Sequence, residues 1–181
     1  MPVMGITLRN ATPDDAAALA GIYRPYVESS SATFEEVAPD AREMESRIRA
    51  TLDGCFPWLV AEEAGAIIGY AYAGPYHKRS AYRFTVENSV YVRADRHRRG
   101  IARALMQQVI AACTALGYRQ MIARISAPTP GMEGPSPDFH AALGFRRAGF
   151  TPGVGFKFGR WIDVIEMQLT LGEGNTTRPR G

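Results

Sequence analysis

The sequence predicts a single α+β domain, and three observations support this fold class. Segments that alternate like β-strands and segments with the three- and four-residue spacing of amphipathic helices both occur along the chain. Two predicted strands, at residues 58–61 and 67–72, are separated only by a short turn and therefore form a hairpin. A chain of 181 residues with 46% hydrophobic residues is also long enough to bury one substantial core.

The N-terminal third contains one predicted strand and two predicted helices. Residues 6–9 alternate and predict the strand. Thr12 followed by Pro13 predicts a helix N-cap with proline at the first helical position. A second helix is predicted to begin at residues 39–40 and to end at Gly54. The apolar faces of the two helices are expected to carry Leu19, Ile22, Tyr23 and Tyr26, and Met44, Ile48 and Leu52.

The central strand is predicted at residues 85–92. Its alternation places Glu87, Ser89 and Tyr91 on one face, and Val86, Asn88, Val90 and Val92 on the other. A carboxylate within an apolar strand is costly to bury unless it is paired or used. Two interpretations of Glu87 therefore stay open: an ion pair with Arg83 or Arg124, or a general base whose burial makes it a better proton acceptor.

A basic turn follows this strand and leads into a helix that opens on Gly100. Ile101, Leu105, Val109, Ala112 and Leu116 recur on one face of that helix. Its first turn carries no acidic residue, although helix N-termini favour negative side chains. We infer that the negative charge comes with a ligand, because free N–H groups, Arg98 and Arg99 could bind a pyrophosphate. The alternative is a solvated basic turn; the dinucleotide and P-loop glycine patterns are both absent.

The C-terminal third adds the remaining elements. Gly117 is expected to cap the helix, and residues 118–125 to form a strand. Residues 126–137, rich in proline and glycine, are expected to be an insertion before a short helix that ends near Gly144. The last strands are expected around Phe150 and residues 161–169, and residues 173–181 are polar.

Composition and charge exclude several classes of protein. A formal net charge of +3 is too small to indicate nucleic-acid binding. The N-terminus does not resemble a secretory signal, and no apolar run is long enough to span a membrane. Cys55 and Cys113 are far apart, which predicts a reducing cytoplasm and a buried, unreactive Cys113. No cluster of metal-ligating residues is apparent, so we expect no metal site.

Three segments, in order, resemble the GNAT superfamily of N-acetyltransferases. Residues 97–102, His-Arg-Arg-Gly-Ile-Ala, resemble its [QR]-x-x-G-x-[GA] pyrophosphate loop, with His97 at the first position. Residues 72–87 and 155–164 resemble the substrate and closing segments of its phosphinothricin and methionine sulfone/sulfoximine acetyltransferase branch. The resemblance covers residues 6–171 and implies one domain with a mixed, mostly antiparallel sheet, splayed in the middle beside Val90, with helices on both faces. Residues 172–181 are expected to be a disordered tail.

The resemblance also implies acetyl-CoA as co-substrate and a set of binding residues. The expected cofactor contacts are Val90, Tyr91, Val92, Arg98, Arg99, Gly100, Ile101, Ala102, Arg103 and Ser136. The family commonly has an Asn before that Ser, but this chain has Glu133 or Gly134 there. Glu87 is the expected general base, acting through a water, and His140 either protonates the leaving thiolate or is only structural. Neither cysteine lies in the cofactor motif, so we expect no covalent acetyl-enzyme.

The acceptor implied is the α-amine of a small amino acid, such as phosphinothricin, methionine sulfoximine or methionine sulfone. Expected substrate contacts are Phe34, His77, Lys78, Arg79, Tyr82, Glu87, Asn88 and Ser89. The basic loop at residues 77–79 could instead simply be solvated. Lys157 and Arg160 are expected to add to the pocket across the interface of a homodimer. The alternatives are a GNAT enzyme for a polyamine, an aminoglycoside or a protein N-terminus, and a non-catalytic acyl-CoA-binding module.

Overall fold

Seven strands and four α-helices make up the part of the domain that the computed structural model describes, residues 5–127 and 134–179. The elements are β1 (Ile6–Asn10), α1 (Ala16–Ser29), α2 (Ala41–Asp53), β2 (Trp58–Glu63), β3 (Ala66–Pro75), β4 (Thr85–Val92), α3 (Ile101–Ala115), β5 (Gln120–Ala127), α4 (Ser136–Ala141), β6 (Arg146–Lys157) and β7 (Arg160–Thr170). Short 3₁₀ turns at Pro13–Asp15, Ser80–Tyr82 and Ala94–Arg96 precede α1, β4 and the turn into α3.

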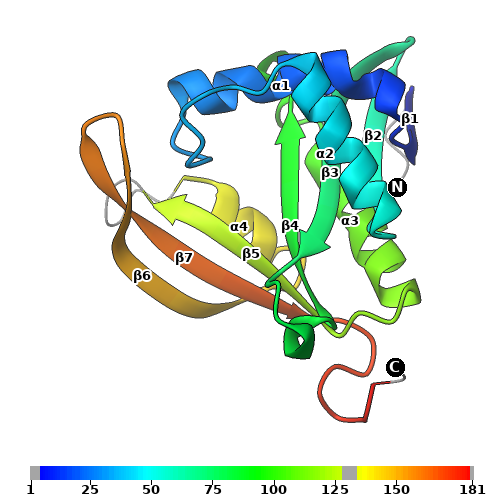
Figure 1. Cartoon of the computed structure of the whole chain (residues 1–181), viewed down its shortest axis with the longest axis vertical. Helices are drawn as coiled ribbons and strands as arrows, with labels where there is room; N and C mark the ends of the chain where they lie inside the picture. Colours follow the sequence, from blue (N-terminus) through cyan, green and yellow to red (C-terminus); the bar gives the residue numbers. More distant parts are fainter. Residues whose placement is uncertain (1–4, 128–133, 180–181) are drawn as a thin grey trace.

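The strands form one sheet in the order β1-β2-β3-β4-β5-β7-β6. Every neighbouring pair is antiparallel except β4 and β5, which are parallel. Their pairing runs only from Thr85↔Gln120 to Glu87↔Ile122, and beyond it the two strands diverge, as Figure 1 shows. The predicted fold, a mixed, mostly antiparallel sheet splayed in the middle, is therefore confirmed. The pairing ends at Glu87, so Val90 lies within the splayed part of the strand, as expected.

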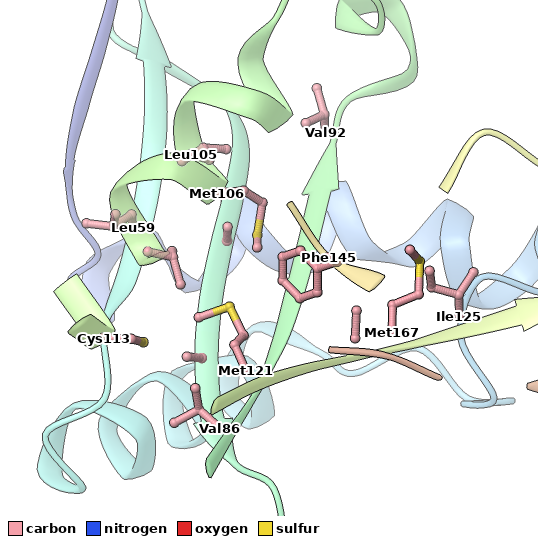
Figure 2. Close-up of a cluster of buried hydrophobic side chains, with 14 of the residues drawn as sticks. Leu59, Val86, Val92, Leu105, Met106, Cys113, Met121, Ile125, Phe145 and Met167 are labelled. Atoms are coloured by element: carbon pink, nitrogen blue, oxygen red, sulfur yellow. The ribbon is translucent and has the colours of Figure 1, made fainter. Parts of the chain in front are cut away.

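Each face of the sheet carries its own core. Helices α1 and α2 pack on one face with Trp58, Val60 and Tyr70. Helix α3 covers the other face, where it contacts β2, β3 and β4 (Figure 1). Leu105 and Val109 of α3 belong to the second core, which Figure 2 shows extending to Phe145 and Met167. Alternate residues of the central strands serve the two cores because side chains alternate across a pleated sheet.

Helix α3 ends just before the last position of its predicted apolar face. Ile101, Leu105 and Val109 are buried, but Leu116 is 55% exposed because it caps the helix, and the chain turns away at Gly117 with φ +87°. The expectation that Leu116 packs in the core is wrong. Cys113 is fully buried, and burial raises the pKa of its thiol to about 12.

The start and end of α2 follow the predicted pattern, whereas α4 ends at Ala141 rather than near Gly144, and β5 runs into the segment expected to be an insertion. The Asp40 side chain accepts the N–H of Glu43 at 2.8 Å and so caps α2.

Residues 128–133, including Glu133, lie outside the described residues. After β7, the carboxylate of Glu173 lies 3.3 Å from the guanidinium of Arg119, which ties the start of the C-terminal tail to the residue before β5. In the described part of the chain, no helix combines the length and apolarity needed to cross a membrane.

Candidate active site

Strand β4 borders two cavities of similar size. One, of about 720 Å³, lies beside Val90 and Val92 and the N-terminus of α3, and is called here the helix-terminus cavity. The other, of about 740 Å³, is lined by Glu87, Ser89 and Tyr91 and is called the Glu87 cavity. The two sets of side chains fall on opposite sides because they alternate along one strand. The two cavities therefore lie on opposite faces of β4, with only this strand between them.

The helix-terminus cavity is built to receive an anion. Gly100 precedes α3 with φ +79°, no side chain caps the helix, and its first turn carries no acidic residue. The first bond of the helix joins Ala104 N–H to Gly100 O, so the N–H groups of residues 101–103 have no partner within the helix. Arg98 and Arg103 line the cavity together with Gly100. Free N–H groups, the helix dipole and two guanidinium groups all favour a bound pyrophosphate.

Arg98 itself adopts the left-handed conformation, with φ +59°. A non-glycine residue is seldom found there, and such strain often accompanies a binding site. Ser136 and Phe139 of α4 also line the cavity.

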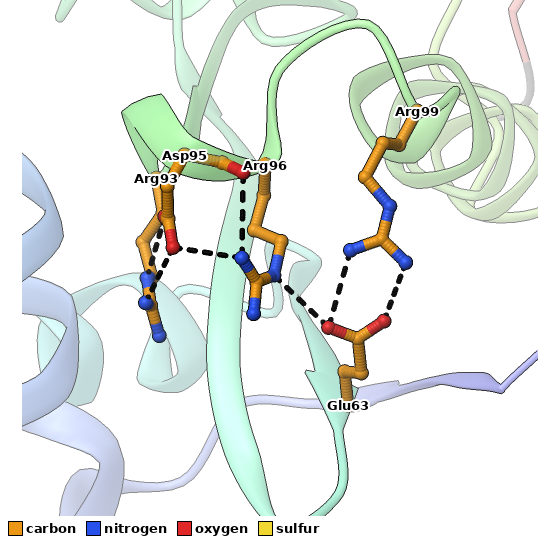
Figure 3. Close-up of polar contacts among 5 residues, drawn as sticks. All are labelled: Glu63, Arg93, Asp95, Arg96 and Arg99. Carbon is orange, nitrogen blue, oxygen red and sulfur yellow. Dashed lines mark hydrogen bonds and ion pairs between the residues drawn. The ribbon is translucent and has the colours of Figure 1, made fainter.

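The side chain of Arg99 does not reach the cavity, which corrects the expectation that it helps bind the anion. Its two terminal nitrogens lie 2.6 and 3.2 Å from the Glu63 carboxylate at the end of β2, as Figure 3 shows. Arg96 also donates to Glu63, at 3.0 Å, and to Asp95, at 2.7 Å. Arg99 and Arg96 hold the pKa of the Glu63 carboxyl below its usual range. Arg99 thus fastens the basic turn to the β2–β3 hairpin.

The edge of β4 that faces the splay is free of strand partners after Glu87. Two side chains bind the carbonyl of Val92: the Tyr26 hydroxyl donates to Val92 O at 2.6 Å, and His97 Nε2 lies 2.9 Å from the same oxygen. Because a carbonyl only accepts, that His97 nitrogen carries a proton. Tyr26, which was expected on the apolar face of α1, lines the helix-terminus cavity together with His97.

The Tyr91 side chain faces the other way. It lines the Glu87 cavity and packs edge-on against Tyr23, with ring centroids 4.8 Å apart. A contact between Tyr91 and the cofactor would therefore have to come from its backbone.

Glu87 sits at the point where β4 and β5 separate, with its carboxylate 2.9 Å from the guanidinium of Arg124 on β5. Of the two ion-pair partners that the sequence left open, the structure selects Arg124. Arg83 instead donates to Ser80 O and lies over the Phe84 ring. Glu166 of β7 stands directly opposite Arg124 in the register and also lines the cavity. No local signal in the sequence pointed to Glu166, because only the β5–β7 pairing brings it there.

The outer wall of the Glu87 cavity is the loop between α1 and α2. Phe34, which is 40% exposed, lines the cavity with its ring against Gly155 of β6, where any added Cβ would collide with that ring. Lys157 of β6 is 2% exposed, and its ammonium donates to Ser30 O at 2.9 Å and to Thr33 O at 2.8 Å. Lys157 therefore stabilises the backbone of this loop through hydrogen bonds but does not itself line the cavity.

Hydrogen bonds from buried Tyr23 and half-buried Arg47 hold the inner side of this loop. The Tyr23 hydroxyl lies 2.7 Å from the Thr33 hydroxyl and donates to Glu35 at 3.0 Å, and burial raises the pKa of Tyr23 to about 12. Arg47 of α2 binds both oxygens of Glu35, at 2.7 and 3.0 Å. The positive charge of Arg47 therefore balances the negative charge of Glu35 in this wall of the cavity.

His140 lies outside both cavities. It is 4% exposed, its Nδ1 is 2.9 Å from Ser136 O, and its Nε2 is 3.2 Å from the Asn88 amide nitrogen. The carbonyl requires the proton on Nδ1, so Nε2 accepts from Asn88. Burial lowers the pKa of His140, which favours the neutral ring. In this arrangement His140 joins α4 to β4, and its ring is not presented to either binding space.

The basic loop after β3 also stays apart from the Glu87 cavity. His77, Lys78, Arg79 and Tyr82 are all exposed, and none of them lines either cavity. Asn88 and Ser89, from the same set of expected substrate contacts, do line the Glu87 cavity. Within the described residues, no three His, Cys, Asp or Glu side chains gather where they could hold a metal ion.

Comparison with known proteins agrees with this geometry. Residues 8–165 match the family model described as "Acetyltransferase (GNAT) domain". Phosphinothricin N-acetyltransferase of Alcaligenes faecalis is 46% identical over 175 residues, which cover 96% of this chain and 86% of that protein. An L-methionine sulfoximine/L-methionine sulfone acetyltransferase of Pseudomonas paraeruginosa is 35% identical, covering 93% and 96%. The crystal structure of a GNAT superfamily phosphinothricin acetyltransferase from Sinorhizobium meliloti in complex with AcCoA superposes with a TM-score of 0.90 at 44% identity, covering 98% of this chain and 94% of that one.

Proposed function

Because the chain belongs to the GNAT acetyltransferase family and is an acetyl-CoA-dependent N-acetyltransferase, we propose that its acceptor is the α-amine of a small amino acid. Phosphinothricin, methionine sulfoximine and methionine sulfone define the class, since the relatives that bear those names align over nearly the whole chain. The observation that carries the proposal is the position of Glu87. It stands at the apex of the splay, facing one cavity, while Val90 and Val92 of the same strand face the other.

The helix-terminus cavity fits acetyl-CoA. Its pyrophosphate would bind the free N–H groups at residues 101–103 with Arg98 and Arg103, where negative charge is otherwise lacking. The unpaired edge of β4 offers backbone groups near Val90 for the amides of the pantetheine arm. Bound there, acetyl-CoA supplies an acetyl group activated as a thioester.

The chemical task of the protein is to present an unprotonated amine. An α-amine is largely protonated at neutral pH, and only the free base attacks a thioester. We assign Glu87 as the general base that takes this proton, directly or through one water. The amine nitrogen then bonds to the acyl carbon and the C–S bond breaks. The proton that the nitrogen loses as the amide forms passes through solvent to the departing CoA sulfur. The geometry supports no such proton transfer by His140, which is buried away from both cavities.

A polyamine is the rival acceptor, because the Glu87 cavity itself is rich in carboxylates. Glu35, Glu87 and Glu166 line it, together with Arg124 as the one cation among the described lining residues, while the basic loop at residues 77–79 lies elsewhere. Two features weaken the rival: Arg47 neutralises Glu35, and Arg124 stands between Glu87 and Glu166. The acceptor loop at residues 77–82 and a homodimer remain predictions.

The test is to offer the purified protein acetyl-CoA with each amine and to measure the release of free CoA thiol and the mass of the product. The panel contains phosphinothricin, methionine sulfoximine, methionine sulfone, a polyamine, an aminoglycoside and an N-terminal peptide. We expect the highest kcat/KM with a member of the amino-acid class. A higher kcat/KM for the polyamine would contradict the proposal, and acetyl-CoA binding without turnover on any amine would favour the non-catalytic module.

A further inference from the structure

Arg124 is placed to recognise the acceptor, although nothing in the sequence marked it for that role. Among the residues of the described ranges that line the Glu87 cavity, it carries the one cationic side chain. Its guanidinium is 2.9 Å from the Glu87 carboxylate, and its side chain is 52% exposed. The cavity therefore presents a negative and a positive group side by side, at the position where β4 and β5 diverge.

An α-amino acid has the complementary pattern. Its ammonium and its carboxylate are bonded to the same carbon, so they too stand side by side with opposite charge. We propose that Arg124 binds the α-carboxylate of the acceptor and thereby places the α-amine at Glu87. This inference rests on the proposed function and adds to it the residue that recognises the amino-acid backbone.

The chemistry of the guanidinium supports this role. An arginine has five N–H donors in a planar fork that matches the two oxygens of a carboxylate. Arg124 approaches Glu87 through its Nη2, at 2.9 Å, and its side chain, 52% exposed, borders the cavity. Charge-assisted, bidentate pairs of this kind are both stronger and more directional than neutral hydrogen bonds.

The neighbouring charges fix the orientation of the acceptor. Glu166 lies opposite Arg124 in the pairing of β5 with β7, and both Glu87 and Glu166 line the cavity with Arg124. A substrate carboxylate would be repelled by Glu87 and Glu166 and is tolerated only against Arg124. The ammonium group is attracted to Glu87 for the same reason. An acceptor bound the other way round would place like charges together.

Binding of the substrate carboxylate also changes which charged groups contact Glu87. In the free protein, the guanidinium of Arg124 lies 2.9 Å from the Glu87 carboxylate. When the substrate carboxylate shares the guanidinium, Glu87 gains the substrate ammonium as a second partner. One proton then passes from that ammonium to Glu87, leaving the amine lone pair free for the acyl carbon. Acceptors without a carboxylate leave the original pair intact and are activated less well.

The experiment compares two acceptors that differ only at the carboxylate: methionine sulfone and methionine sulfone carboxamide. We measure kcat/KM for each with the unaltered protein, with Arg124→Gln and with Arg83→Gln. Arg83 is the matched control, since it is an exposed arginine near the same strand that lines neither cavity. Acetyl-CoA affinity and thermal unfolding are measured for each variant, to show that the fold is kept.

We expect kcat/KM of the unaltered protein to be about 10- to 100-fold higher for the acid than for the carboxamide, because a charge-assisted hydrogen-bonded pair contributes about that factor. Arg124→Gln should bring this ratio close to one, chiefly through KM for the acid, while Arg83→Gln keeps it. Equal rates for the two acceptors in the unaltered protein, or an unchanged ratio in Arg124→Gln, would overturn the inference. If Arg124→Gln does not fold, the ratio of kcat/KM for the acid to kcat/KM for the carboxamide in the unaltered protein still tests whether the cavity recognises a carboxylate. Turnover of polyamines alone would instead reject the proposed function itself.

Discussion

Replacing Lys157 with methionine tests whether β6 supports the wall of the Glu87 cavity. The ammonium of Lys157 donates to Ser30 O and Thr33 O, and the side chain is almost fully buried. A hydrogen bond from a charged donor contributes about 1.5 kcal/mol at the low end of its range, so the two bonds together contribute about 3 kcal/mol. Methionine has a similar length and recovers about 1 kcal/mol through apolar burial. The expected loss in the free energy of unfolding is therefore about 2 kcal/mol.

For a chain of this length, that loss lowers the midpoint of thermal unfolding by about 4–8 °C. Because the same loop carries Thr33, Phe34 and Glu35 into the cavity, KM for the acceptor should rise, while the affinity for acetyl-CoA stays unchanged. The assays are thermal unfolding followed by circular dichroism and steady-state kinetics with each substrate varied. Arg42→Met, at an exposed cation in the first turn of α2 that lines neither cavity, is the control. An unchanged midpoint together with an unchanged acceptor KM in Lys157→Met would refute this reasoning.

Three other outcomes follow from the site. Arg98→Ala should weaken acetyl-CoA binding about tenfold, measured by calorimetry, because Arg98 lines the cavity. Arg99→Ala should change the affinity little, because the Arg99 guanidinium binds Glu63. Equal losses of affinity in the two variants would show that both arginines reach the cofactor. Glu87→Gln should lower kcat by about 10²- to 10⁴-fold with acetyl-CoA affinity retained, and comparable turnover would remove Glu87 from the mechanism. Burial lowers the pKa of His140 below its usual 6.5, so its contribution to stability is present above pH 6.5 and is lost as the pH falls toward the lowered value. Stability against urea should therefore weaken less between about pH 7 and pH 5 in His140→Asn than in the unaltered protein; parallel curves would mean that His140 does not titrate in this way.

Much of the fold was predictable because its signals are local. The helix that opens at Gly100 was visible in the three- and four-residue spacing of Ile101, Leu105 and Val109, all of which are buried. Only the end of that pattern failed: Leu116 continues the spacing, but the chain has already left the helix there. The β2–β3 hairpin likewise depends on neighbouring segments and a short turn, which the sequence alone displays.

The order of residues along β4 was enough to predict which side chains the strand presents to each face. Because side chains alternate along any strand, Glu87 and Val90 had to point to opposite faces, and they border different cavities. The absence of an acidic residue in the first turn after Gly100 is likewise a local feature, and it predicted an anion site at the start of α3.

Only the tertiary structure decided which partners those groups meet. Arg98 and Arg99 are adjacent and alike in sequence, yet one borders a cavity and the other is bound to Glu63, 36 residues earlier. Arg124 and Glu166 come together through a pairing of β5 with β7 that spans a long stretch of chain. Long-range ion pairs depend on where whole strands pack, and side-chain charge alone does not encode that position.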